Sequence, residues 1–337
     1  MNKFTKIGVS ALCGSLAGIA SANAGALSVS GGADLSWASL SGDVTGNPIG
    51  MGSNIGFSGS GELDNGTAVS LSIAYTNKAA YSASNVTLDM PTLGTLIITQ
   101  GVSGTGIDRY DDKMPTAWEE ATGTALGTGI RTVGAVAAGA GIEWTPSMLP
   151  EGISARLAYS PRVGGASSND KKTSGDDGGI GGGFDIIVES SSLMDGLNVF
   201  AGMGEIEQSD TASYDGDRSQ YTVGATYAIG MVTAGYQYSR DNMQNNGAGA
   251  ASYYENDIWG VSFNISDDLS LSYGEHESKK SVSGGTDVTT EVESIQVAYS
   301  MGGASIRLAE AKGTALKYAT GSSNDKDGTT ISLSLAF

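Results

Sequence analysis

Charged side chains that could act on ions are concentrated in one stretch of the sequence, residues 102–131. This stretch carries the carboxylates Asp108, Asp111, Asp112, Glu119 and Glu120. Carboxylates in a narrow passage with low-dielectric walls concentrate cations, so their chemistry would be electrostatic attraction without bond making. Segments this long without a strand or helix pattern are uncommon in compact proteins unless they are functional or disordered. The stretch is therefore the main candidate site, and an ordinary solvated loop is the alternative. Within it, residues 116–121 combine a Thr cap with good helix formers and predict a short helical turn.

Covalent catalysis finds little support among the residues. His276 is the only histidine in the chain, so a Ser/His/Asp site would have to include it, and no Gly-x-Ser-x-Gly motif precedes it. A membrane-embedded lipase would need a serine on the outward face beside His276, and we interpret the outward positions there as apolar. We predict no enzyme activity and no organic cofactor.

A metal site is a weaker hypothesis. Asp325 and Asp327 lie close together near the carboxyl terminus, as do Asp176 and Asp177. Their oxygens are ligands of the kind that Ca²⁺ and Mg²⁺ prefer, but neither pair continues into an EF-hand with its glutamate at position twelve. Solvated loop charge is the simpler interpretation, and bound Ca²⁺ or Mg²⁺ on these loops is the alternative.

The elements that must position the charged residues follow a two-residue alternation. Ile331, Leu333, Leu335 and Phe337 are apolar, and small or polar residues separate them, so a strand would place the two sets on opposite faces. The same alternation recurs along the chain, and helical periodicity is almost absent. We predict sixteen strands, at residues 26–39, 51–62, 67–77, 84–90, 94–101, 132–145, 152–162, 180–190, 195–206, 219–229, 231–241, 253–265, 268–278, 290–301, 303–312 and 329–337.

The connections between these strands alternate between short turns and long polar loops. An even number of strands of about 9 to 11 residues, joined in this way, is what a closed barrel across an outer membrane requires. A soluble β-sandwich shares the two-residue period, but its outward face would carry more charge and it would not need aromatic residues near strand ends. Six aromatic residues are candidates for interfacial girdles: Trp37, Trp144, Tyr159, Tyr221, Trp259 and Tyr299.

Charge and the amino terminus narrow the class further. The formal net charge of −18 repels phosphate backbones, so nucleic acid is a poor partner. A basic start, an apolar stretch and Ala22-Asn23-Ala24 predict a cleaved signal peptide at residues 1–24, followed by one domain at residues 25–337. The single cysteine, Cys13, lies within the signal peptide. No later run of 18 apolar residues exists, which excludes a helical membrane protein.

Strand parity assigns further charges to the inside of the barrel. An arginine on the lipid face at mid-membrane costs about 2 to 4 kcal/mol, so Arg156 and Arg307, whose parity is opposite to that of their apolar neighbours, should point inward. Together with Arg131 they would face or border the carboxylates of residues 102–131. Arg240 has outward parity and should reach the rim by snorkelling.

Three features together resemble a known family. They are the sixteen predicted strands behind a signal peptide, the segment DMPTLGTL at residues 89–96 with Gly101 after it, and the terminal L-x-L-x-F at residues 333–337. In these the chain resembles the Gram-negative trimeric general porins, in particular the alphaproteobacterial type. The resemblance implies an all-β fold: a 16-stranded antiparallel transmembrane β-barrel with long external loops and a third loop, here residues 102–131, that folds inward as the constriction.

The resemblance also implies a function. It implies a homotrimer in the outer membrane of a Gram-negative bacterium, in contact with lipid and lipopolysaccharide, with a water-filled channel for passive diffusion of ions and small hydrophilic solutes. Better-known porins set loop acids against arginines contributed largely by early strands, but residues 25–100 hold no arginine and one lysine, Lys78. We therefore expect an acid-dominated, cation-preferring aperture. A substrate-selective channel and a non-conducting structural or adhesive barrel remain as alternatives. Small residues at 132–141 would suit a protein–protein contact of the trimer.

Overall fold

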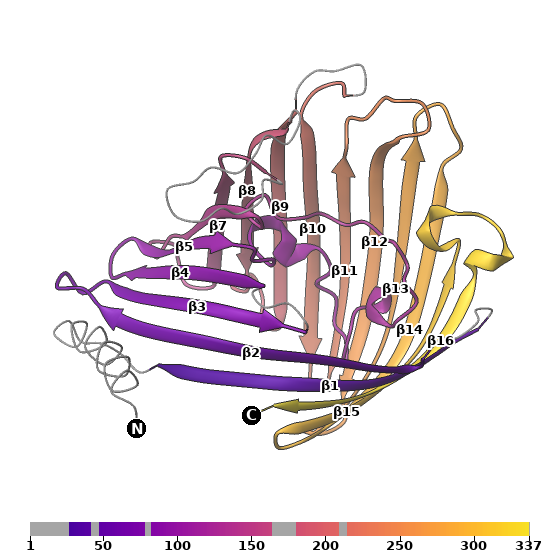
Figure 1. Ribbon diagram of the computed structural model, residues 1–337, viewed down its shortest axis with the longest axis horizontal. Coiled ribbons are helices and arrows are strands. Elements are labelled where there is room, and N and C mark those ends of the chain that lie inside the picture. The colour runs from indigo at the N-terminus through magenta and orange to yellow at the C-terminus, as the bar shows by residue number, and fades with distance from the viewer. Residues whose placement is uncertain (1–26, 42–46, 78–81, 164–179, 209–213, 337) are drawn as a thin grey trace, which may run out of the picture.

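The structure is a computed structural model that describes residues 27–41, 47–77, 82–163, 180–208 and 214–336. Within these residues, sixteen antiparallel strands form one closed barrel in which each strand pairs with its sequence neighbours and β1 pairs with β16 (Figure 1). The strands are β1 (Ser28–Leu40), β2 (Ile49–Glu62), β3 (Ala68–Thr76), β4 (Ala83–Met90), β5 (Gly94–Gln100), β6 (Ala140–Thr145), β7 (Ile153–Ser160), β8 (Ile180–Ser190), β9 (Leu197–Gln208), β10 (Arg218–Ile229), β11 (Val232–Asn242), β12 (Ala251–Asn264), β13 (Leu269–Val282), β14 (Val288–Met301), β15 (Ala304–Thr314) and β16 (Lys326–Ala336). The predicted fold class is confirmed. The predicted signal peptide, Lys78, Asp176, Asp177 and Phe337 lie outside the described residues.

The alternation in the sequence sets the two faces of the wall. On β10, Tyr221 and Val223 point outward and are exposed, whereas Gln220 and Thr222 point inward and are buried. The adjoining strands β9 and β11 pair with β10 in register, so apolar side chains cover most of the outside of the barrel and mainly polar ones face the lumen. No helix among the described residues is long and apolar enough to cross a membrane.

Short connections join the strands at one end of the barrel, which we call the turn end. One residue pair suffices between β10 and β11, where Gly230 has a positive φ of 58°. Gly94, which opens β5, has a φ of 90°, and a Cβ atom there would lie 2.1 Å from the carbonyl oxygen of Thr145. Only glycine fits this hairpin, because any side chain would collide with the neighbouring backbone.

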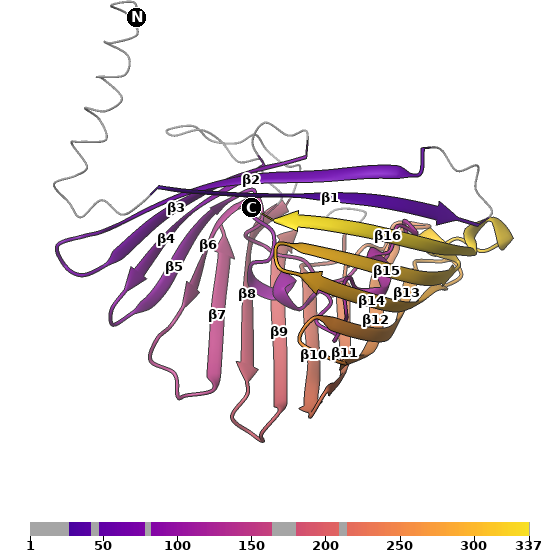
Figure 2. The same ribbon diagram turned by 90° about the horizontal axis from the view of Figure 1, so that it is seen from below.

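The segment between β5 and β6, residues 101–139, runs inside the barrel, and we call it the inner loop (Figure 2). Its apolar residues form the main buried cluster together with inward residues of the wall: Ile107, Tyr110, Met114 and Val133 of the loop pack with Ile187, Phe200 and Ile258. The protein core therefore lies between loop and wall, since the apolar outer face of the barrel remains exposed.

The return part of the inner loop differs from the prediction. We expected a strand from residue 132, but β6 begins at Ala140. Val133, Val136 and Ala137 are at most 2% exposed and pack inward, so the expectation that residues 132–141 form a protein–protein contact is wrong for most of this segment. Apolar side chains spaced every few residues are compatible with a strand and also with an irregular segment packed against the inside of the barrel. The spacing of apolar residues alone does not distinguish these two structures.

The expected helical turn at residues 116–121 is also displaced. The short 3₁₀ turns of the inner loop are η1 (Gly106–Tyr110) and η2 (Ala121–Gly123), and the residues between them are irregular. The backbone N–H of Ala117 donates to Ser272, and those of Trp118 and Glu119 donate to Gln296. These donors pair with the wall, so no helix is required to satisfy them.

Carboxylates occupy part of the outer wall nearer the end opposite the turns. Asp257, Glu275, Glu277, Glu291, Glu293 and Glu310 hold outward positions on β12 to β15, and we call them the outer acidic band. Two of them, Glu275 and Glu277, flank His276, so the expectation that outward positions near His276 are apolar is wrong. Glu275 accepts hydrogen bonds from Trp259 Nε1 (3.1 Å) and the Tyr273 hydroxyl (2.6 Å), which places the band next to aromatic residues.

Candidate functional site

Three glutamines of the wall hold the inner loop in place: Gln220 on β10, Gln237 on β11 and Gln296 on β14. Each is at most 2% exposed. The oxygen of Gln237 accepts the Lys113 N–H (3.0 Å) and its nitrogen donates to the Tyr110 carbonyl (2.6 Å). The other two also bond an N–H and a C=O of the loop, so the three amides act like the peptide groups of a partner strand.

Five described arginines that point into the lumen have a wall carboxylate beside them. Glu143 on β6, fully buried, lies 2.6 Å from Arg109 and 3.8 Å from Arg156. The remaining pairs are Arg131 with Asp241 (3.0 Å), Arg218 with Asp241 (2.7 Å) and Arg307 with Asp34 (3.7 Å). The loop lysine Lys113 follows the same rule, because it lies 2.7 Å from Glu189. Each of these cations thus has a carboxylate beside it, with Glu143 and Asp241 each shared between two arginines.

The carboxylates of the inner loop lack such partners. Among the described residues, no ion pair is formed by Asp108, Asp111, Glu119 or Glu120. Oδ2 of Asp112 lies 3.8 Å from Nδ1 of His276, which is a cation only when it is protonated. Asp108 accepts a hydrogen bond from the Gly104 N–H (2.6 Å), which fixes its orientation and leaves its charge. Within the described part of the chain these four loop carboxylates therefore have no ion-pair partner, and Arg307 acts on Glu119 only from a longer distance.

Burial and mutual repulsion hold some of these acids close to neutrality. Burial raises the pKa of Asp111 to about 6, and the charge of Asp108 adds to the effect. Burial, with the charges of Glu120 and Asp111, raises the pKa of Asp112 to about 7. Burial likewise raises the pKa of Glu119. A mobile cation nearby would stabilise the ionised form of these carboxylates.

The side of the lumen opposite the loop is polar and carries little charge. Inward positions of β3 and β4, such as Ser70, Ser72, Asn85 and Thr87, remain partly accessible, whereas the inward residues of β10 to β14 that bond the inner loop, such as Gln237 and Gln296, are buried. Strands β1 to β5 contain no lysine, arginine or histidine. We call this accessible region the open side of the lumen; no cation of these strands faces the loop acids across it.

The predicted site residues are placed as follows. Asp108, Asp111, Asp112, Glu119, Glu120 and Arg131 all belong to the inner loop, and Arg156 and Arg307 point into the lumen. Arg307 also lies over the Trp118 ring at 5.9 Å. Arg131 turns away from the loop acids toward Asp241 on β11. Arg240, predicted to reach the rim, bonds Glu255 on the outer face (3.0 Å).

Sequence reasoning missed two residues that organise the site. Asp241 is fully buried and pairs with two arginines, and Gln220 binds the loop backbone. Inward parity was the only signal available for Gln220, which shares the face of Thr222. Asp241 is the penultimate residue of β11. At such a position the sequence does not distinguish the end of a strand from the start of a loop.

The proposed metal ligands show no cation site of their own. The Asp325 carboxylate accepts the Ala315 N–H (2.9 Å), and the Asp327 N–H donates to Ser41 (2.8 Å). No group of three or more His, Cys, Asp or Glu residues in the described part of the chain is arranged to hold a metal ion. Ca²⁺ or Mg²⁺ at Asp325 and Asp327 stays a prediction.

Comparisons with known proteins agree on the architecture. A family model of Gram-negative porins matches residues 8–303. The fold is similar to that of OmpF of Salmonella typhi, solved in complex with daunomycin (TM-score 0.69, 13% identity, 93% of this chain and 98% of that chain). It is also similar to the anion-selective porin from Comamonas acidovorans (TM-score 0.65, 14%, 93% and 100%) and to the trimer form of OmpT, an outer membrane protein of Vibrio cholerae (TM-score 0.66, 12%, 94% and 100%). No curated protein matches in sequence.

Proposed function

Because the chain belongs to the Gram-negative porin family, we propose that it forms a water-filled channel in the outer membrane for passive diffusion of ions and small hydrophilic solutes, with a preference for cations. The observation that carries the preference is the charge pairing inside the barrel. Five lumen arginines are held beside wall carboxylates, whereas Asp108, Asp111, Glu119 and Glu120 form no ion pair among the described residues.

The mechanism is electrostatic. A mobile cation on the open side of the lumen meets unpaired carboxylates on the loop and hydroxyl and amide groups on β3 and β4. Low-dielectric surroundings strengthen the attraction between such charges and a counter-ion relative to bulk water. An anion meets the same carboxylates and finds no free cation on β1 to β5. The aperture should therefore admit cations more readily.

The fold does not set the sign of this preference. The Comamonas acidovorans porin, described as anion-selective, has a similar fold at 14% identity. Selectivity in such a barrel depends on the charges that line it, so the argument for cations rests on the side chains of the inner loop. These residues are the proposed constriction: Asp108, Asp111, Asp112, Glu119, Glu120, Arg131, Arg156 and Arg307.

The assembly and surroundings are part of the proposal. We propose a homotrimer, in line with the trimer form known for Vibrio cholerae OmpT. Outside the contacts between subunits, the outward apolar side chains of the barrel would contact outer-membrane lipid. Lipopolysaccharide would surround the end of the barrel at which β5 leads into the inner loop. Export through a cleaved signal peptide at residues 1–24 belongs to the same proposal.

Reversal potentials in planar bilayers test the channel and its selectivity separately. Under a salt gradient the wild-type protein should show single-channel steps and a reversal potential of cation-selective sign. The variant Glu119→Gln/Glu120→Gln should retain conductance and lose part of the cation preference, while the matched control Glu277→Gln, on the outer face, should match the wild type. An anion-selective sign would reject the preference. Absence of steps would favour a non-conducting barrel, and liposome swelling that saturates with one solute would favour a substrate-selective channel.

A further inference from the structure

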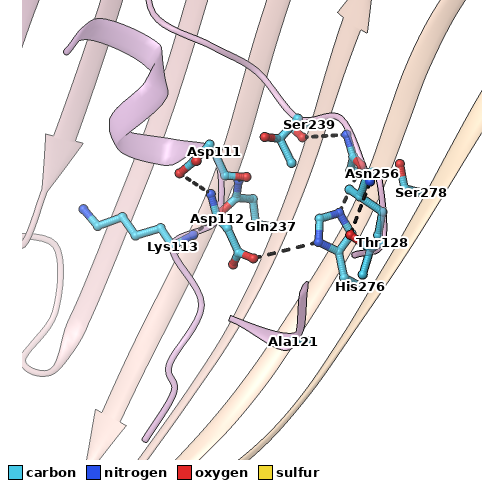
Figure 3. A network of polar contacts seen from close by, with 12 residues as sticks. Asp111, Asp112, Lys113, Ala121, Thr128, Gln237, Ser239, Asn256, His276 and Ser278 are labelled. Carbon is cyan, nitrogen blue, oxygen red and sulfur yellow. Dashed lines mark hydrogen bonds and ion pairs between the residues drawn. The ribbon is translucent and has the colours of Figure 1, made fainter. Parts of the chain in front are cut away.

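One buried polar contact between the inner loop and the wall lacks a donor. His276, on the inward face of β13, is 1% exposed. Its Nδ1 lies 3.8 Å from Oδ2 of Asp112 on the inner loop (Figure 3). Neither atom has a hydrogen-bond partner in the described structure, and both are inaccessible to solvent. Buried polar atoms without partners are costly, so this pair requires an explanation.

Asn256 on β12 fixes which imidazole nitrogen carries the proton. Its Nδ2 donates to the Arg131 carbonyl (3.1 Å) and to Ser239 (3.3 Å), and a carbonyl can only accept. The Asn256 amide nitrogen must therefore face these groups, and its Oδ1 must face His276 Nε2 at 3.0 Å. Because an amide oxygen can only accept, Nε2 of His276 has to be the donor.

This assignment leaves two acceptors facing one another. In a neutral imidazole protonated at Nε2, the Nδ1 atom carries a lone pair. An ionised Asp112 would direct a second lone pair and a negative charge at it across 3.8 Å. One additional proton, on either atom, changes the repulsive contact into an ion pair or, after a small rotation of the Asp112 side chain, a hydrogen bond.

We propose that Asp112 and His276 hold one shared proton between the inner loop and the wall, and that loss of this proton adds a negative charge at the constriction and so increases cation preference. The second part rests on the proposed channel function, and the first does not. His276 thereby acts as a positioning residue for Asp112, because it holds the carboxylate without contacting the permeating ion.

The surroundings favour keeping this proton. The partners of His276 in the strand register, Ile258 and Val292, are apolar and buried. From the inner loop, the carboxylates of Asp111 and Glu120 face Asp112 and oppose its ionisation, in agreement with its pKa of about 7. Arg131, whose backbone carbonyl accepts from Asn256, has its guanidinium paired with Asp241 on β11, and the Tyr318 phenol bonds Ser278 of β13. None of these supplies a cation to the pair.

The net charge of the Asp112–His276 pair changes with pH. Below the midpoint the pair holds its proton and is neutral overall. Above the midpoint the proton is lost, the pair carries one negative charge, and the loop loses a contact with β13. Cation preference should therefore rise as the pH increases through about 7. A separate rise through about 6 is expected from Asp111.

The only histidine of the chain allows a direct test. In untagged protein labelled with ¹⁵N-histidine, NMR should show a protonated Nε2 at all pH values and an Nδ1 signal whose position follows the titration of Asp112 near pH 7. In Asp112→Asn, whose amide can donate to Nδ1 at every pH, this titration should disappear. A bare Nε2 with a protonated Nδ1, or the same titration in Asp112→Asn, would overturn the shared proton whatever the protein conducts.

Reversal potentials between pH 5 and 9 test the consequence for selectivity. The wild type should show two increases in cation preference, Asp112→Asn should lose the upper one, and the control Asp111→Asn should lose the lower one. If the upper increase persists in Asp112→Asn, the pair does not set selectivity. If the NMR result holds and the wild type shows no cation preference, the proposed selectivity fails and the shared proton stands.

Discussion

Replacing Glu143 by Gln should loosen the inner loop at its first wall contact. Glu143 is fully buried on β6 and accepts three hydrogen bonds, from the Gly106 N–H (2.6 Å) and from Arg109 Nε (3.3 Å) and one terminal Arg109 nitrogen (2.6 Å). Arg156 lies 3.8 Å away. With its amide oxygen at the Oε2 position, the variant can keep the bonds from Gly106 and from Arg109 Nε, whereas its NH₂ group would face the terminal Arg109 nitrogen, donor against donor.

The magnitude follows from the bonds lost. Each hydrogen bond to a charged group contributes about 1.5 to 3 kcal/mol, and the variant loses the bond from the terminal Arg109 nitrogen and the negative charge that strengthens the other two. Arg109 is 30% exposed, so water recovers part of this loss. We expect the free energy of unfolding to fall by about 2 to 3 kcal/mol, below the full range for breaking a buried pair. Loss of the carboxylate charge also leaves Arg109 and Arg156 less neutralised, so cation preference should decrease.

Urea unfolding in detergent micelles, followed by tryptophan fluorescence, measures the first effect, and reversal potentials measure the second. The outward carboxylate of Glu277 supplies the control, because a surface substitution such as Glu277→Gln should change stability by less than about 0.5 kcal/mol. If Glu143→Gln is as stable as this control, the buried carboxylate does not anchor the loop. If its reversal potential is unchanged, Glu143 does not neutralise the lumen arginines.

Four further outcomes are expected. Gly94→Ala should reduce the yield of folded barrel on refolding, because the Cβ would collide with backbone across the hairpin; wild-type yield would contradict that geometry. Leu71→Arg, on the lipid face, should cost about 2 to 4 kcal/mol in unfolding free energy, whereas its inward neighbour Ser72→Arg should not. Gln296→Ala should raise single-channel conductance by freeing part of the inner loop; unchanged conductance would show that the loop stays seated. Lowering the pH from 7 to 5 should reduce cation preference as Asp111, with a pKa of about 6, takes up a proton.

The barrel could be predicted from the sequence because each strand must present apolar side chains on the face that meets lipid, which leaves a two-residue alternation. Tyr221 and Val223 could be assigned outward from their parity alone, and the register confirms it. The inner loop has no such constraint, since both of its sides meet protein or water. Val133 and Val136 therefore resembled a strand although they lie under the wall.

Charges could be assigned to a face but not to partners. Parity sent Arg156 and Arg307 inward, and the structure places both there. The contact between Arg131 and Asp241 joins residues 110 positions apart, and no local pattern encodes so distant a pairing. Likewise nothing in the sequence indicated that Asp112 meets His276, because the path of the loop decides it.

The outer acidic band limits how deeply one arc of the barrel can sink into hydrocarbon. On β13 the outward residues are apolar from Leu269 to Tyr273, and Glu275 follows at once, whereas β10 remains apolar or aromatic outward from Tyr221 to Ile229. Carboxylates are costly inside a bilayer, so the lipid edge must stop lower beside β13. Membrane thickness should thus vary around the circumference, with a dip along β12 to β15 that any neighbouring molecule or lipid has to match.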